Sequence, residues 1–178
     1  MKNPLYLISF CILLFLSSCG ASYQIETKKD PYKNMDVVTL YAWHDVTEGW
    51  VDNYAANYRT EIKNSKRSPT ELTLHLKYAT SEENLKEEFF IKVDGKMYNL
   101  KFNEITLNNH SLVDANTQVV VGGFKTFKAT IILPEEIEQS LLSAKSMTIR
   151  MYTGKNPTSL EASDDQLTKL KEFLMMYR

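Results

Sequence analysis

The segment FFIKVDGKMYNLKF, residues 89–102, decides the fold class of this chain. Apolar and aromatic residues lie on both sides of Asp94-Gly95, a dipeptide that supplies the positive φ angles of a type I′ turn. The sequence therefore predicts a β-hairpin with strands over residues 89–93 and 96–102, in a chain built mainly of antiparallel strands.

Strict alternation predicts another strand, in which Leu72, Leu74, Leu76 and Tyr78 alternate with polar residues. A period of two places the apolar side chains on one face and leaves the other face in water. Similar patterns predict strands over residues 37–43, 105–107 and 147–152, a polar loop over 108–111, and a hairpin turn at Gly122-Gly123 between strands over 117–121 and 124–133.

Residues 45–63 carry two competing patterns. Three aromatic residues, Trp50, Tyr54 and Tyr58, recur at helical spacing. The residues that follow Tyr58 alternate in the manner of a strand instead. We expect helix or irregular structure up to about Ala56 and a strand after it.

Two helices are predicted near the C-terminal end. Pro134 suits a first helical turn and predicts a short helix to about Ala144. A second helix begins after Ser163, which is placed to form a capping box with Gln166. Its apolar stripe comprises Leu167, Leu170, Phe173, Leu174 and Tyr177.

These elements predict one mainly β (α+β) domain over residues 36–178, with seven or eight short strands. We expect an antiparallel β-sandwich or a partly open barrel with the C-terminal amphipathic helix packed on one face. A domain of this length buries roughly two thirds of the surface of its unfolded chain, which suffices for independent folding.

The first twenty residues, MKNPLYLISFCILLFLSSCG, have the layout of a secretory signal peptide. Lys2 precedes an apolar run from Leu5 to Leu16, and two small residues follow. An apolar helix of about 12 residues is roughly 18 Å long, which is short for a hydrocarbon core of about 30 Å. A signal peptide over residues 1–18 is therefore favoured over a transmembrane helix.

The end of this segment, Leu16-Ser17-Ser18-Cys19, resembles the lipobox of bacterial lipoproteins. The resemblance implies a diacylglycerol on Cys19, usually with an acylated amino group, and hence a membrane anchor. Gly20 follows the cysteine where an Asp would favour the inner membrane, so the lipoprotein pattern favours the outer membrane of a Gram-negative cell. An ordinary secreted protein with a cysteine there by chance is the alternative.

Residues 19–35 are mixed polar and predict a lipidated, flexible tether. Because Cys11 leaves with the signal peptide and Cys19 carries the lipid, no thiol remains for a disulfide, a metal site or a nucleophile. The 21 basic and 22 acidic side chains balance, so the charge gives no indication of nucleic-acid binding.

Catalytic motifs are absent from the sequence, including a nucleophile elbow and a phosphate-binding glycine loop, so we expect neither enzyme activity nor a cofactor. His44 beside Asp45 suggests a general base oriented by a carboxylate; the alternative is a histidine at the rim beside an unrelated aspartate. His75 and His110 lack neighbours at metal-ligand spacing, so no metal site is predicted.

Five aromatic residues fall within eighteen positions, namely Tyr41, Trp43, Trp50, Tyr54 and Tyr58. Aromatic faces with polar groups between them bind sugar rings and protein partners. Trp43, Trp50 and Tyr54 are therefore candidates for a ligand or partner surface. The alternative is that these rings fill the core.

The sequence favours a lipid-anchored, non-catalytic β-domain of the cell envelope that binds another envelope protein or a glycan. The first alternative is an inhibitor or immunity lipoprotein that plugs an envelope hydrolase, with the loop over residues 108–116 as the plug. An envelope hydrolase is a more remote alternative.

Overall fold

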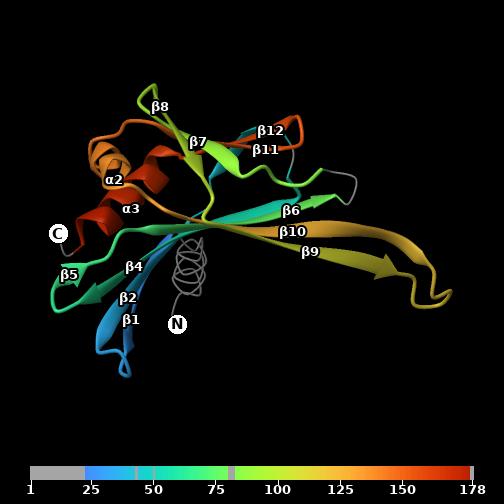
Figure 1. The fold of residues 1–178 in the computed structure, drawn as a ribbon, viewed down its shortest axis with the longest axis horizontal. Coiled ribbons are helices and arrows are strands. Elements are labelled where there is room, and N and C mark those ends of the chain that lie inside the picture. The colour runs from blue at the N-terminus through green and yellow to red at the C-terminus, as the bar shows by residue number, and fades with distance from the viewer. Residues whose placement is uncertain (1–22, 43, 50, 80–82, 177–178) are drawn as a thin grey trace, which may run out of the picture.

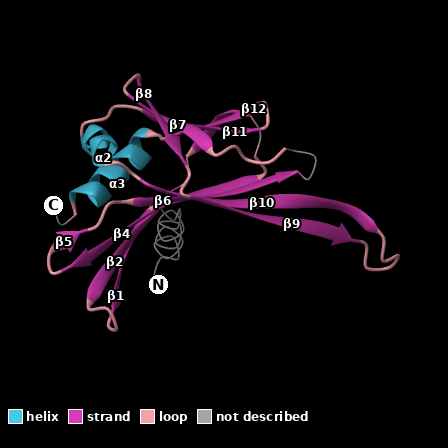
Figure 2. Cartoon of the chain, viewed as in Figure 1, coloured by secondary structure: helices cyan, strands magenta, loops and turns pink. Residues whose placement is uncertain are grey.

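The computed structural model describes residues 23–42, 44–49, 51–79 and 83–176. Within them the chain forms twelve strands and two helices, and the strands make up two antiparallel sheets (Figures 1 and 2). Neither sheet closes on itself. The mainly β fold with a C-terminal helix is therefore confirmed as two open sheets, and the strands exceed the seven or eight predicted.

The larger sheet has seven strands: β1 (Gln24–Asp30), β2 (Met35–Ala42), β4 (Asn53–Lys63), β5 (Lys66–Arg67), β6 (Glu71–Ala79), β9 (Glu104–Val113) and β10 (Val120–Ile132). Their order is β1-β2-β4-β6-β10-β9, with β5 paired to β4. All neighbouring strands are antiparallel. β1 and β9 are consequently the edges of this sheet.

The smaller sheet has five strands: β3 (Asp45–Glu48), β7 (Glu88–Val93), β8 (Lys96–Lys101), β11 (Met147–Thr153) and β12 (Asn156–Glu161). Their order is β3-β12-β11-β7-β8. Two helices accompany this sheet, α2 (Glu135–Leu142) and α3 (Asp164–Met175). Figure 1 shows the smaller sheet and both helices on the same side of the larger sheet.

The alternation of apolar and polar residues along the strands explains why a core forms between the larger sheet and the layer made of the smaller sheet and the helices. In β6, the predicted residues Leu72, Leu74, Leu76 and Tyr78 are all buried, while His75 is exposed. They belong to one hydrophobic cluster that includes residues of both sheets and both helices. The hydroxyl of Tyr78 also lies 3.3 Å from Oγ1 of Thr158 in the smaller sheet, so the two layers share a polar contact as well as apolar packing.

The hairpin predicted over residues 89–102 is confirmed as β7 and β8. Asp94 and Gly95 have φ angles of 47° and 87°, as a type I′ turn requires. The Asp94 carboxylate accepts hydrogen bonds from the backbone N–H groups of Lys145 and Ser146, both at 2.8 Å. Those hydrogen bonds lower the pKa of Asp94. The turn therefore also holds the connection between α2 and β11.

Both predicted helices are confirmed. α2 follows Pro134, and α3 follows Ser163, whose backbone N–H donates to Oε1 of Gln166 at 3.0 Å in a capping box. The predicted stripe of α3 is buried over Leu167–Leu174, and Tyr177 lies outside the described residues. Among the described helices, none is long and apolar enough to span a membrane.

The prediction of a tether over residues 19–35 is wrong for Gln24–Asp30, which forms β1. This strand pairs with β2 along its whole length. An edge strand has a neighbour on one side only, and none of the side chains of β1 is fully buried. A mixed polar composition without alternation is therefore compatible with a strand at this position.

The prediction of helix or irregular structure over residues 45–56 is also wrong, because β3 and β4 occupy most of this stretch. Tyr54 and Tyr58 are four positions apart, a spacing that places two residues on one face of a strand as well as of a helix. Gly49 follows β3 with a φ of 79°. A Cβ atom at Gly49 would lie 2.0 Å from the carbonyl oxygen of Pro157, so the chain turns there against β12.

The second hairpin is longer than predicted, and its turn lies elsewhere. β9 runs through the predicted polar loop to Val113, and Gly122-Gly123 lies inside β10 beside a register shift. The turn is formed by residues 114–119. Side chains in the outer half of β9 are exposed on both faces, so no alternation marks that strand in the sequence. β12 was not predicted.

Candidate functional site

The β9–β10 hairpin extends beyond the body of the protein (Figure 1). β6 pairs with β10 only from Phe124 to Ile132, whereas β9 pairs with β10 as far as Val120. Residues 111–123, which we call the arm, therefore form a ribbon with which no third strand pairs in the described part of the chain. Two-stranded ribbons are marginally stable in water by themselves.

Aliphatic side chains gather on this arm. Of the eleven large hydrophobic side chains that are exposed in the described residues, five belong to the arm, with exposed fractions of 50–68%. They are Leu112, Val113, Val119, Val120 and Val121. Exposed apolar side chains that gather on one element mark a site of interaction more often than single scattered ones do. The arm is therefore the main candidate for a binding site.

Asp114 orders the turn at the end of the arm. Its Oδ1 accepts hydrogen bonds from the backbone N–H groups of Asn116 and Thr117, at 2.9 and 2.8 Å, and from the Thr117 hydroxyl at 3.0 Å. These bonds lower the pKa of Asp114. Its backbone also exchanges hydrogen bonds with Gln118 and Val119. The aliphatic side chains thus flank a polar, internally bonded turn.

A hollow of about 640 Å³ lies at the base of the arm. Most of its lining residues face away from the smaller sheet, on what we call the outer face of the larger sheet. The strand register places these residues on the same face, because residues that pair directly across two strands share a face. His75 pairs with Lys128, Lys77 with Thr126, and Phe124 with His110. The Lys77 ammonium lies 4.3 Å from the centroid of the Phe124 ring, and His110 stacks on that ring at 4.5 Å.

A second hollow, of about 310 Å³, continues across the outer face toward β2. It shares His75 and Lys128 with the first hollow and extends to Tyr41 and Arg59. We call the two hollows together the groove. Burial and the nearby Lys128 charge lower the pKa of His75. Lys128 is therefore close enough to His75 to act on it electrostatically.

His44 lies in the core rather than at the rim, and it does not pair with Asp45. Its side chain is 1% exposed. Nδ1 donates to Oε1 of Gln166 at 3.0 Å, and Nε2 accepts from the Tyr58 hydroxyl at 2.9 Å. Burial lowers the pKa of His44, against opposing effects of Gln166 and Asp45. The neutral imidazole forms a hydrogen bond at each ring nitrogen and so links β4, which carries Tyr58, to α3, which carries Gln166.

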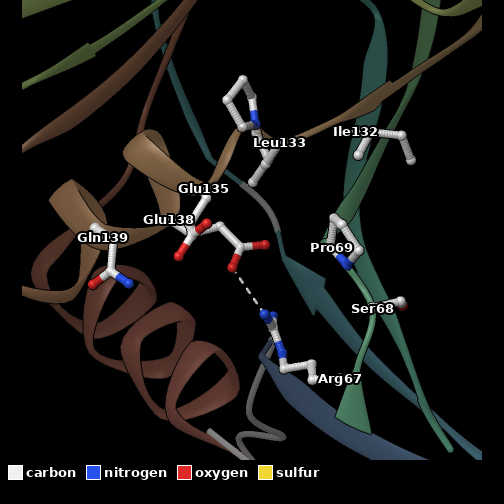
Figure 3. Close-up of a pocket in the computed structure, with 9 residues that line it drawn as sticks. Arg67, Ser68, Pro69, Ile132, Leu133, Glu135, Glu138 and Gln139 are labelled. Atoms are coloured by element: carbon white, nitrogen blue, oxygen red, sulfur yellow. Dashed lines mark hydrogen bonds and ion pairs between the residues drawn. The ribbon is translucent and has the colours of Figure 1, made fainter.

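A third hollow, of about 580 Å³, lies between α2, the end of β10 and the chain that leads from β5 toward β6 (Figure 3). Arg67 donates to Glu138 at 2.8 Å and to the Thr70 hydroxyl at 2.6 Å, and both charged side chains are more than nine-tenths buried. Burial raises the pKa of Glu138, but bonds from Thr70 and Arg67 outweigh it and lower the pKa overall. This ion pair links α2, which carries Glu138, to β5 of the larger sheet, which carries Arg67.

The predicted aromatic surface is only partly described. Trp43 and Trp50 lie outside the described residues, as does the proposed lipidation residue Cys19. Tyr54 is half-buried opposite Leu76, and burial raises its pKa to about 12. Tyr58 is in the core, whereas Tyr41 is exposed on the outer face. The described rings therefore divide between two faces and do not form one patch.

The sequence carries one signal for the arm, the run Val119-Val120-Val121, which predicts a strand but not its exposure. Among the described residues, no cluster of three His, Cys, Asp or Glu side chains is arranged to hold a metal ion. Comparison with known proteins finds no matching family, no similar curated protein and no similar solved structure.

Proposed function

We propose that this protein is a lipid-anchored, non-catalytic module of the cell envelope that binds another protein through its arm. The observation that carries the proposal is the set of five exposed aliphatic side chains on residues 112–121. Leaving them in water is unfavourable by roughly 25 cal/mol for each Å² of apolar surface. A partner that covers them gains this free energy on binding.

A protein suits the arm better than a lipid bilayer does. The outermost part of the arm is the polar turn around Asp114, and insertion into hydrocarbon would carry that charge deepest. A protein cleft offers polar partners to such a turn and apolar surface to the valines behind it. The arm carries no aromatic residue between Ser111 and Gly123, which makes a sugar a poorer occupant.

The rigidity of the turn favours tight binding. Three hydrogen bonds to Asp114 hold the loop before any partner arrives. Preorganisation reduces the conformational entropy that binding would otherwise remove. β9 is also an edge strand of the sheet, so a partner strand has backbone groups to pair with beside the aliphatic side chains.

The lipid anchor belongs to the same proposal. A diacylglycerol on Cys19 would be five residues from the first residue of β1, Gln24. Extended chain of that length spans roughly 17 Å, so the domain stays close to the membrane surface. We place it on the outer membrane, in keeping with Gly20 after the cysteine.

An inhibitor of an envelope hydrolase is the second candidate. The arm supports it, because a narrow ribbon with an ordered polar turn fits an enzyme cleft. In that case the bound partner is a hydrolase whose activity the arm blocks. The two candidates share a binding surface and differ in what happens to the partner.

Photo-crosslinking in the native envelope tests the arm. A photoreactive residue replaces Val120, and in a matched control it replaces Met97, an exposed apolar residue of β8. We expect one stoichiometric product from position 120 and none from position 97. The purified partner should then bind the wild-type protein, and V120D/V121D should bind at least about tenfold more weakly. Equal binding by both proteins would refute the arm as the site.

Two further measurements complete the test. Labelling with radioactive palmitate should mark the wild-type chain and not Cys19→Ala, and equal labelling would refute the anchor at Cys19. The purified partner is assayed for cell-wall hydrolysis with and without the protein. Inhibition that is lost in V120D/V121D selects the inhibitor, whereas unchanged hydrolysis or a partner without hydrolase activity selects the binding module.

A further inference from the structure

We propose that the groove across the outer face of the larger sheet binds an acidic saccharide. The groove lies on strands β2, β4, β6, β9 and β10 and is separate from the arm in its lining residues. The inference depends on neither the protein partner nor the lipid anchor.

The positive charges that line the groove favour an anionic ligand. Lys77 and Lys128 line the hollow at the base of the arm together with His75 and His110, and this hollow has no acidic lining residue. Within the described part of the chain, neither lysine forms an ion pair. Two uncompensated ammonium groups in one hollow attract a carboxylate or a phosphate.

The positions of these charges are partly fixed. Lys77 lies over the Phe124 ring, which also stacks on His110. Nε2 of His110 is in turn 3.1 Å from Oγ1 of Thr126. A lysine held by a ring loses less side-chain freedom when it meets an anion than a fully solvated lysine does.

The other end of the groove supplies neutral hydrogen-bonding groups. Thr39, Asn57 and Thr73 line it beside the exposed ring of Tyr41. Glu71 is the only acid that lines either hollow, and it lies opposite Arg59. Hydroxyl and amide side chains next to an aromatic ring match the alternating polar and apolar surfaces of a sugar.

These features favour a saccharide over an acidic peptide. A peptide that binds a sheet pairs with an edge strand or fills apolar pockets, whereas the groove reaches the edge strand β9 at one end and otherwise crosses inner strands such as β4 and β6. Their backbone groups are already paired on both sides. Recognition here therefore rests on side chains, which suits ring hydroxyls and a single acidic group.

Binding of small probes to the full chain tests the proposal. The protein is kept in a polyoxyethylene detergent, which carries no sugar, and titrated calorimetrically with trigalacturonate, galactotriose, triglutamate and inorganic phosphate. We expect trigalacturonate to bind more tightly than the other three, and added salt to weaken its binding. Equal affinity for triglutamate or phosphate would overturn the saccharide, and absence of trigalacturonate binding would overturn the site.

Substitutions of residues that line the groove test whether trigalacturonate binds there. K77Q/K128Q should weaken trigalacturonate binding at least about tenfold, and Tyr41→Leu should weaken it about threefold or more. Lys101→Gln, on the exposed surface of β8 in the other sheet, is the matched control and should bind as the wild type does. Circular dichroism checks that each variant is folded. Unchanged affinity in K77Q/K128Q, or an equal loss in Lys101→Gln, would place the probe elsewhere and refute the groove.

Discussion

The side-chain oxygen of Gln166 lies 3.0 Å from Nδ1 of His44, although the two residues are 122 positions apart. The same oxygen accepts the backbone N–H of Ser163 at the start of α3. His44 connects β2 of the larger sheet to β3 of the smaller sheet. The buried side-chain amide of Gln166 therefore links α3 to the segment in which the chain passes from the larger sheet to the smaller sheet.

This contact makes stability depend on pH. Burial lowers the pKa of His44 in the folded protein, so the unfolded chain binds a proton more readily. As pH falls below the unfolded value of about 6.5, the free energy of unfolding should decrease, by up to about 1.4 kcal/mol per pH unit, until the folded pKa is reached. Above about pH 7 this contribution is constant.

Urea denaturation between pH 5 and pH 8 measures this effect. His44→Gln should be less stable than the wild type at pH 7.5 and should show a shallower dependence on pH. His110→Gln, on the exposed strand β9, is the matched control for the loss of a histidine side chain. An unchanged slope in His44→Gln would show that another group causes the pH effect.

Arg67 and Glu138 form a buried pair at 2.8 Å, and removal of one partner leaves a buried charge uncompensated. We expect Glu138→Leu to lower the free energy of unfolding by about 3–5 kcal/mol. In R67M/E138L both charges are gone, so most of the loss should be recovered. Urea denaturation of Arg67→Met, Glu138→Leu and the double variant gives the coupling energy. Additive effects would mean that the pair does not act as a unit.

Gly49 and Gly95 both have positive φ angles, 79° and 87°, but their surroundings differ. A Cβ atom at Gly49 would lie 2.0 Å from the Pro157 carbonyl oxygen, whereas one at Gly95 would have no neighbour within 4 Å. Gly95→Ala should therefore cost only the conformational strain, about 1 kcal/mol. Gly49→Ala must also displace β12 and should cost on the order of 3 kcal/mol or more. Thermal denaturation compares them, and equal costs would contradict the predicted clash.

Local pattern predicted those elements that expose one face and bury the other. β6, β7, α2 and α3 have this property, and β8 alternates between exposed and half-buried side chains over most of its length. Each of these elements lies close to its predicted position. β1 and the outer half of β9 were missed because nearly all their side chains are in contact with water. β12 contains Pro157 and lacks strict alternation. Hydrophobic periodicity carries no information about such strands.

The candidate sites were harder to predict for a different reason. Neither reading of His44, a general base beside Asp45 or a histidine at the rim, predicts its buried position, because its partners Tyr58 and Gln166 are remote in the sequence. The groove forms only when β6 is placed between β4 and β10, an order that no local pattern specifies. The exposure of Val120 likewise follows from the end of β6 and not from its own neighbours.

Asp114 should control the order of the arm without contributing to the core. Asp114→Ala removes the oxygen that accepts the N–H groups of Asn116 and Thr117, and we expect their hydrogen exchange to be at least about tenfold faster. Asp114→Asn keeps an acceptor oxygen and should exchange nearly as the wild type does. The midpoint of global unfolding should not change, since none of the described residues adds a third strand to the arm. Because the arm is then less preorganised, Asp114→Ala should also bind the crosslinked partner more weakly. Faster exchange with undiminished binding would show that the aliphatic side chains alone, and not the ordered turn, determine recognition.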